Sequence, residues 1–251
     1  MHRFYLPALP RDAADFPLSR GDARKILRVL KLDRGDEVWL WDEEGREYRA
    51  VITKTAGMSV YVRVLEERGR DVESPLRLAL VQGIPKGDKF EFIIQKATEL
   101  GVWRIYPAVT ERTVVRIPAE RRESRLRRWQ AVAREAARQC GRVQIPQVMP
   151  AAPLDEILTC DHDPAAHRMF LWERETGDNS LKGYLLSRAQ SPAAPVYVFV
   201  GPEGGFSARE AELARSCGCA AVTLGSRILR TETAALIGLS LILYEWGDLG
   251  G

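Results

Sequence analysis

Hydrophobic and polar positions alternate through much of the first seventy residues, which is typical of half-buried strands. The pattern predicts three strands, at residues 36–41, 48–54 and 59–65. The first two flank a turn-like polar segment at residues 42–45 and therefore predict a hairpin. A helix is expected before them over residues 19–31, with Ser19 as its N-cap. A unit that is this small and mostly strand favours a β-barrel.

From residue 76 the pattern changes to short, continuously apolar runs that alternate with amphipathic segments. Such runs are typical of strands covered on both faces, and they occur at residues 76–82, 104–109, 169–172, 196–200 and 221–224. The amphipathic segments predict helices at residues 89–100, 121–140, 207–217 and 233–246. This alternation predicts an α/β domain with a mainly parallel sheet. Residues 155–167 and 187–195 are expected to be irregular connections.

A polar stretch at residues 66–75 ends in proline and reads as a linker. The chain is therefore expected to form two domains, residues 1–73 and residues 74–251. Apolar residues make up 45% and charged residues 28% of the chain, which excludes a disordered or fibrous protein. No apolar run is long enough to span a membrane and the start lacks a signal peptide, so we expect a cytoplasmic protein.

Positive charge is concentrated in one part of the chain. The net charge is only +3, but residues 112–142 contain ten arginines and three glutamates, a charge of +7. A basic stretch on an otherwise nearly neutral protein indicates a polyanionic partner such as nucleic acid, although a solvated helix face would look the same. The four cysteines are too few for a disulfide framework in a chain of this length, and no arrangement of His and Cys suggests a metal site.

The segment Gly-Pro-Glu-Gly-Gly-Phe-Ser at residues 201–207 follows the most apolar predicted strand. Its glycines allow the backbone to approach a ligand closely, and Ser207 with Glu210 forms a capping box that opens the next helix. The carboxyl ends of parallel strands are where open α/β sheets bind ligands. The loop is neither a Walker A sequence nor a Gly-x-Gly-x-x-Gly fingerprint, which disfavours nucleoside triphosphates and NAD. A plain tight turn remains the alternative.

A second polar segment, residues 224–233, lies between a predicted strand and an almost wholly apolar helix. It ends in the dense cluster Arg230-Thr231-Glu232-Thr233. Capping of the helix by Thr231, with Arg–Glu pairs around it, is the structural alternative to a functional site.

Together these segments resemble the SPOUT class of S-adenosylmethionine-dependent RNA methyltransferases. Within it they are similar to the RsmE family, which methylates N3 of a uridine in 16S ribosomal RNA. Further stretches carry the resemblance: Gly-Ile-Pro-Lys-Gly-Asp-Lys at 83–89, Gln-Lys-Ala-Thr-Glu-Leu-Gly at 95–101, Arg-Glu-Ala-Ala-Arg-Gln-Cys-Gly-Arg at 134–142 and Ile-Pro at 145–146. Ile-Leu-Arg-Val-Leu at 26–30 with Gly-Asp at 35–36 resembles the family's small PUA-like RNA-binding barrel.

The resemblance implies a C-terminal domain with a deep trefoil knot and a homodimer joined through the helix that begins at Ala234. It implies that S-adenosylmethionine binds to three loops. The residues expected to hold this cofactor are Leu171, Trp172, Glu173, Gly201, Pro202, Glu203, Gly204, Gly205, Leu224, Gly225, Ile228, Leu229, Arg230 and Ala234. No metal and no membrane is expected to take part.

Methylation of uracil N3 requires an unpaired base and loss of the N3 proton. We expect Arg230 to stabilise the resulting anion, and Thr231, Glu232 and Thr233 to fix the base or its proton path. The RNA of the small ribosomal subunit is expected to contact Arg24, Arg28, Lys86, Arg112, Arg116, Arg134, Arg138 and Arg142. The last three recur every four residues and are predicted to share one helix face. Two alternatives stay open: another SPOUT activity, on a ribose 2′-O or on guanine N1 of transfer RNA, and a catalytically silent RNA-binding assembly protein.

Overall fold

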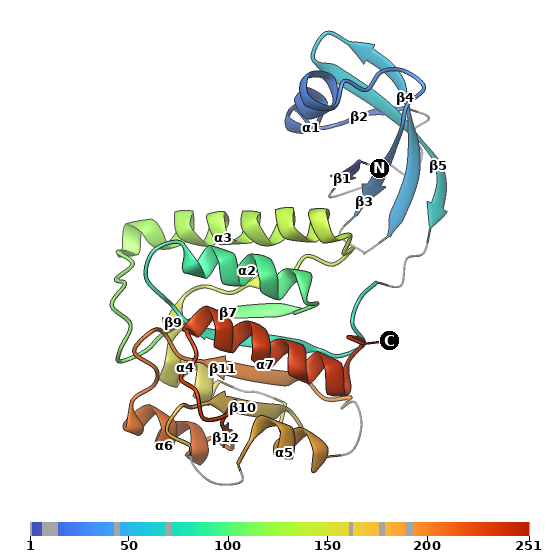
Figure 1. Ribbon diagram of the computed structural model, residues 1–251. Helices are drawn as coiled ribbons and strands as arrows, with labels where there is room; N and C mark the ends of the chain where they lie inside the picture. Colours follow the sequence, from blue (N-terminus) through green and yellow to red (C-terminus); the bar gives the residue numbers. More distant parts are fainter. Residues whose placement is uncertain are drawn as a thin grey trace. The chain divides into compact units, whose positions relative to one another are not determined.

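A computed structural model of the chain describes residues 2–6, 15–42, 46–68, 72–160, 163–175, 179–188 and 193–250. The chain forms two compact units, which Figure 1 shows in ribbon form. Unit 1 contains residues 1–73 and 137–144, and unit 2 contains residues 74–136 and 145–251. None of the helices in the described part of the chain is long and apolar enough to cross a membrane.

Unit 1 is built on a five-stranded sheet with the order β1-β3-β4-β5-β2. Its strands are β1 (Arg3–Tyr5), β2 (Phe16–Pro17), β3 (Glu37–Trp41), β4 (Glu47–Ala56) and β5 (Ser59–Arg68). The three predicted strands are confirmed as the antiparallel run β3-β4-β5, whereas the two short strands that precede them were not predicted. The turn predicted between β3 and β4 lies largely outside the described residues.

The predicted N-terminal helix of unit 1 begins where expected, because the Ser19 side chain accepts a hydrogen bond from the Asp22 amide. The α-helix α1 (Arg20–Arg24) continues directly as the π-helix η1 (Lys25–Leu30). The helix ends at Lys31, which adopts the left-handed conformation with φ of 54°. Ile26 is fully buried in the core of the unit.

Residues 137–144 belong to unit 1, although the sequence analysis placed them in the second domain. The Glu73 carboxylate explains this, since it accepts hydrogen bonds from the Arg142 guanidinium at 2.7 Å and 2.9 Å and from the amides of Val143 and Gln144. The Arg142 side chain is only 6% exposed. Arg142 also lies beyond the end of α3 (Ala119–Cys140), so the expectation that it shares a helix face with Arg134 and Arg138 is wrong.

Unit 2 contains a seven-stranded sheet in which every pairing is parallel, as predicted. The order is β12-β10-β11-β6-β7-β8, with β9 also paired to β7. The strands are β6 (Leu78–Gly83), β7 (Arg104–Val109), β8 (Gln147–Val148), β9 (Ala152–Pro153), β10 (His167–Leu171), β11 (Val196–Val200) and β12 (Ala220–Val222). Both β6 and β11 are buried at every position, which matches their largely apolar sequences.

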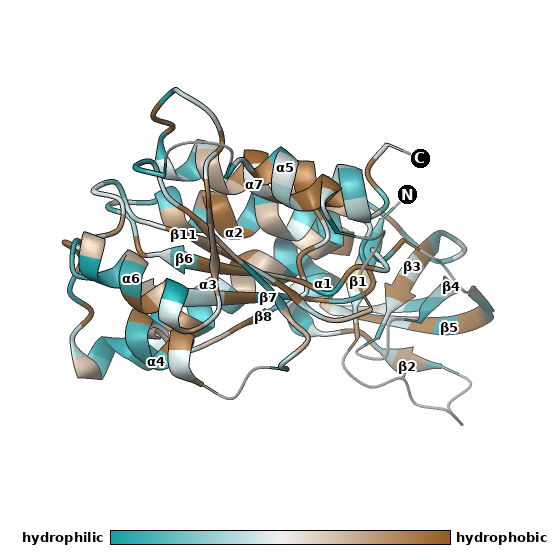
Figure 2. Ribbon diagram, turned by 90° about the horizontal axis from the view of Figure 1, so that it is seen from below, coloured by the Kyte–Doolittle hydropathy of each residue, from teal (hydrophilic) through white to brown (hydrophobic). Residues whose placement is uncertain are grey.

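Helices cover both faces of this sheet, because successive side chains of a strand point to opposite faces. Leu78 and Leu80 of β6 pack in the same cluster as α2 (Lys89–Glu99), α3, α5 (Leu181–Leu186) and α7 (Thr231–Trp246). Ala79 and Val81 pack with α4 (Leu154–Thr159) and α6 (Ala208–Ser216). In Figure 2 the hydrophobic colour lies mainly on the strands and on helix sides near them.

Two expectations for unit 2 need correction. Residues 155–167 are not wholly irregular, because α4 occupies their start and buries Leu154, Ile157 and Leu158 at helical spacing. Helix α7 begins at Thr231, two residues before the predicted start. This shift places the polar residues Thr231, Glu232 and Thr233 in the first turn of a helix.

Candidate functional site

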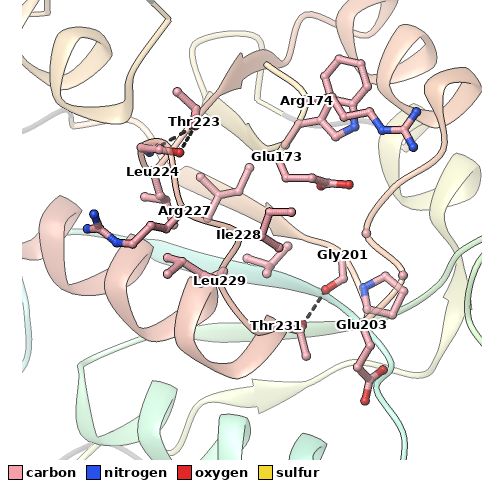
Figure 3. A pocket seen from close by; sticks show the side chains of 18 of the residues that line it. Glu173, Arg174, Gly201, Glu203, Thr223, Leu224, Arg227, Ile228, Leu229 and Thr231 are labelled. Carbon is pink, nitrogen blue, oxygen red and sulfur yellow. Dashed lines mark hydrogen bonds between the residues drawn. The ribbon is translucent and has the colours of Figure 1, made fainter. Parts of the chain in front are cut away.

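A cavity of unit 2 lies at the carboxyl ends of the neighbouring strands β10, β11 and β12 (Figure 3). Its volume is about 360 Å³, within the range of small-molecule sites. The loops after these three strands supply most of the wall, and the start of α7 and Arg112 complete it. Open parallel sheets bind ligands at this edge, so the topology places the cavity where a ligand is expected.

The loop after β11 folds tightly at the floor of the cavity. The Gly205 amide donates to the Pro202 carbonyl at 2.9 Å, and Gly205 has a φ of 65°, which favours glycine. A Cβ atom on Gly201 would lie 2.9 Å from the carbonyl carbon of Gly205. The predicted capping box is confirmed: Ser207 accepts from the Glu210 amide, and Glu210 accepts from the Ser207 amide.

Glu173, from the loop after β10, brings a carboxylate to this glycine loop. A Cβ atom on Gly205 would lie 2.5 Å from the Glu173 Oε1 atom. The positive φ at position 205 favours glycine, and the Glu173 carboxylate lies in the space that a Cβ atom there would enter. The carboxylate lines the cavity and is exposed, so it can accept hydrogen bonds from a ligand.

Glu203 is the second carboxylate in the wall. Its carboxylate accepts from the Lys86 amide at 3.1 Å and from Lys89 Nζ at 3.2 Å. Partial burial raises its pKa, but the hydrogen bonds from backbone amides and the charge of Lys89 outweigh burial and hold the pKa below its usual value. Glu203 is therefore ionised at neutral pH and ties its loop to the start of α2.

The loop after β12 forms an apolar wall. The Thr223 hydroxyl accepts from the Gly225 amide and donates to the Gly225 carbonyl, both at 3.1 Å, which fixes the start of the loop. Ile228 is 84% exposed although it lines the cavity. An apolar side chain so exposed beside Leu229 offers a surface for a flat, apolar ligand group. Figure 3 shows that the Arg227 side chain extends away from the cavity.

The four residues predicted to be catalytic lie at the start of α7. Arg230 is the exposed N-cap residue and is not part of the cavity wall. Thr231 is buried, lines the cavity and donates to the Gly201 carbonyl at 2.6 Å. The carboxylate of Glu232 lies 3.7 Å from Lys89 Nζ, and Thr233 is half-buried. The alternative in which Thr231 caps the helix is wrong, because Arg230 occupies the cap position and no side chain makes the cap hydrogen bond.

The chain is similar in sequence to known RNA methyltransferases. Residues 72–243 match the RNA methyltransferase domain family. Ribosomal RNA small subunit methyltransferase E of Bacillus subtilis is 30% identical over 255 residues, covering 100% of this chain and 99% of the relative. The chain belongs to this methyltransferase family. The protein of the same name from Synechocystis is 33% identical, covering 91% of this chain and 73% of the relative.

A solved structure of the family supports the same assignment. Ribosomal RNA small subunit methyltransferase E of Neisseria gonorrhoeae, crystallised with bound S-adenosyl methionine, superposes with a TM-score of 0.88. It is 33% identical, and the match covers 99% of each chain. The family resemblance inferred from the sequence is therefore confirmed.

The structure brings together nearly all residues predicted for this family's cofactor. Of the fourteen predicted residues, all except Arg230 line the cavity. Five further lining residues were not predicted, namely Arg174, Val200, Thr223, Ser226 and Arg227. All five directly precede or follow a predicted residue, so a wider selection around each predicted position would have included them.

The residues predicted to bind RNA are more scattered. Within unit 2, Arg112 lines the cavity and donates to the Gly204 carbonyl at 2.6 Å, whereas Lys86, Arg116 and Arg134 are exposed. Within unit 1, Arg24 and Arg28 are exposed and Arg138 is half-buried. Arg142 is different, because its guanidinium is buried against Glu73 instead of facing a phosphate. No group of three or more potential metal ligands occurs among the residues that the structure describes.

Proposed function

We propose that this protein transfers a methyl group from S-adenosylmethionine to N3 of a uridine in the 16S RNA of the small ribosomal subunit. The observation that carries the proposal is the cavity at the ends of β10, β11 and β12, where the loops assigned to the cofactor from sequence meet. The site thus has the position, the size and the family context that the activity requires.

The residues of the cavity fit S-adenosylmethionine, which supplies an electrophilic methyl group on its sulfonium when bound. The glycine loop turns tightly at the cavity wall, since a Cβ atom on Gly201 would lie 2.9 Å from the carbonyl carbon of Gly205, and Gly205 has a positive φ. Leu224, Ile228 and Leu229 offer apolar surface for the adenine. The exposed carboxylate of Glu173 can accept hydrogen bonds from hydroxyl or ammonium groups.

Catalysis then depends on positioning and on the acceptor base. Holding two reactants in line can lower the barrier by about 7–11 kcal/mol. Arg230 stands at the exposed edge of the cofactor cavity, beside Thr231, and stabilises the uracil anion at O2 or O4. Glu232 and Thr233 orient the base or relay its proton. Thr231 contributes to the framework of the site, because its hydroxyl proton is engaged by the Gly201 carbonyl.

Two features of the fold belong to the same proposal. Unit 1 is proposed to be a PUA-like barrel that binds RNA, supported by its five-stranded sheet and the exposed Arg24 and Arg28. Unit 2 is proposed to carry the trefoil knot. Its support is the path of α7, which follows the edge strand β12 and yet packs against β6, β11 and α2 (Figure 1).

We also propose that the protein is a homodimer in the cytoplasm, where ribosomes are assembled. Helix α7 carries a stripe of exposed apolar side chains, Ile237, Leu241 and Tyr244, at helical spacing. Phe92 on the neighbouring helix α2 is also exposed. Exposed apolar side chains on two neighbouring helices are typical of a subunit interface.

Cofactor binding tests the proposal first. Titration calorimetry with S-adenosylmethionine is expected to give one site per chain, and sedimentation is expected to give a dimer. Labelled methyl groups are expected to appear in 16S RNA when small ribosomal subunits are supplied. Binding of RNA without any binding of S-adenosylmethionine would instead support the silent assembly protein.

A further inference from the structure

Gln82, near the end of β6, is a polar residue in the middle of the hydrophobic interior. Its side chain is completely buried, and its amide nitrogen meets oxygen atoms from two distant segments. Nε2 lies 2.9 Å from the Thr231 hydroxyl, 3.3 Å from the Gly201 carbonyl and 3.5 Å from the Val200 carbonyl. It also donates to the Gly83 carbonyl at 2.9 Å. One side chain thus joins the loop after β11 to the first turn of α7.

The direction of these hydrogen bonds is fixed by chemistry. A carbonyl oxygen can only accept, so the nitrogen of the Gln82 amide must face the three carbonyls. The Thr231 hydroxyl accepts from Gln82 and donates its own proton to the Gly201 carbonyl at 2.6 Å. Gln82, Thr231 and Gly201 therefore form a chain of hydrogen bonds, in which each member polarises the next.

The side-chain oxygen of Gln82 lowers the stability of the folded protein. Gln82 Oε1 is buried and has no hydrogen-bond partner among the residues that the structure describes. An unsatisfied buried oxygen is destabilising, and an apolar residue would avoid it. The site retains glutamine where its neighbours in β6, Val81 and Leu80, are apolar. Groups that lower stability are commonly kept where function needs them.

We propose that Gln82 is a positioning residue that holds the Gly201 loop against α7 in the geometry that binds the cofactor. The inference rests on the proposed function, since it assigns Gln82 to the S-adenosylmethionine site. The side chain does not line the cavity, so it acts through Thr231 and Gly201, which do.

Three substitutions separate positioning from general stability. Gln82→Met keeps the length of the side chain and removes the amide, and it is expected to weaken S-adenosylmethionine binding about tenfold. Thr231→Val, which removes the hydroxyl, is expected to weaken binding to a similar extent. Thr231→Ser keeps the hydroxyl and is expected to bind S-adenosylmethionine like the wild type. The Gln82→Met/Thr231→Val double variant should bind no more weakly than Thr231→Val, because both changes break one chain of hydrogen bonds.

Gln130 provides a matched control in the same unit. Its side-chain amide bridges two segments away from the cavity, donating to the Pro146 carbonyl at 3.0 Å and accepting from the Val148 amide at 2.9 Å. Gln130→Met should lower the melting temperature at least as much as Gln82→Met and leave cofactor affinity unchanged. If both variants lose the same affinity for S-adenosylmethionine, Gln82 acts only through general stability, and the proposal is overturned.

Hydrogen exchange supplies a readout that does not depend on the cofactor. In Gln82→Met, without ligand, the amides of residues 203–206 and of the first turn of α7 are expected to exchange faster than in Gln130→Met. Unchanged exchange there would overturn the inference. If the wild type fails to bind S-adenosylmethionine, the proposed function is wrong, and the exchange experiment still decides whether Gln82 holds the two segments together.

Discussion

A close approach between two backbone segments involves Gly83, the last residue of β6. A Cβ atom at this position would lie 2.5 Å from Cδ and 2.6 Å from the backbone nitrogen of Pro202, and 3.0 Å from the carbonyl carbon of Gly201. Ordinary contacts of a Cβ atom begin at 3.4 Å. Gly83→Ala therefore requires the Gly201 loop to move by about 1 Å, because neither the proline ring nor the backbone can rotate away.

The magnitude of the effect follows from that displacement. Overpacking of this kind costs about 1–3 kcal/mol, and the lower chain entropy of alanine in the unfolded state returns about 0.4–1 kcal/mol. A net loss of about 1–2 kcal/mol corresponds to a fall in melting temperature of roughly 2–8 °C for a domain of this size. Misplacement by about 1 Å in a catalytic site can lower kcat/KM on the order of a hundredfold.

Calorimetric melting and titration with S-adenosylmethionine measure the two effects of Gly83→Ala separately. We expect both a lower melting temperature and at least a tenfold weaker affinity. Gly21→Ala is the control, because a Cβ there would have only the Ser19 hydroxyl nearby, at 3.7 Å, and α1 tolerates alanine. If Gly83→Ala binds the cofactor and melts like the wild type, β6 does not support the Gly201 loop as described.

Four further predictions concern other parts of the chain. Arg230→Ala should abolish methyl transfer and retain S-adenosylmethionine binding in calorimetry, and loss of binding would contradict its assigned role. Arg138→Ala should weaken RNA binding and lower the slope of log K against log salt by about one, and an unchanged slope would exclude a phosphate contact. Burial and the nearby Arg188 lower the pKa of His167 in the folded protein below the value of about 6.5 in the unfolded chain. The free energy of unfolding should therefore decrease as the pH falls from about 6.5 to the folded-state pKa, because the unfolded chain takes up a proton first. Urea unfolding at several pH values should show a smaller decrease in the free energy of unfolding for His167→Asn than for the wild type. The same pH dependence in both proteins would refute this prediction. Burial raises the pKa of Cys219 to about 11, so iodoacetamide should label the exposed Cys140 and Cys160 before Cys219, as peptide mass spectrometry would show.

The periodicity of the sequence was sufficient to predict most of the strands and helices of unit 2. Continuous apolar runs such as Val196–Val200 predicted buried parallel strands, and the glycine loop that follows this strand predicted a ligand site at the sheet edge. These inferences succeed because burial and backbone conformation restrict the residue type at each position directly. The same logic identified Ser207 and Glu210 as a capping box.

Contacts between segments distant in the sequence could not be predicted in this way. Gln82 looks like an isolated polar residue in a strand, and its role depends on Thr231, which follows it by 149 residues. Arg142 belongs to a regular series of arginines, yet it lies beyond the end of α3 and pairs with the carboxylate of Glu73. Spacing along the chain carries no information on such partners, because they are set by the tertiary fold.

Identification of the methylated nucleoside would show whether this protein methylates uridine N3. The protein would be incubated with labelled S-adenosylmethionine and either assembled small ribosomal subunits or deproteinised 16S RNA, and the labelled nucleoside would be identified by mass spectrometry. We expect 3-methyluridine with the wild type and none with the Arg230→Ala variant. Label on a ribose 2′-O or on guanine N1, or no label in either RNA despite cofactor binding, would contradict the proposed activity.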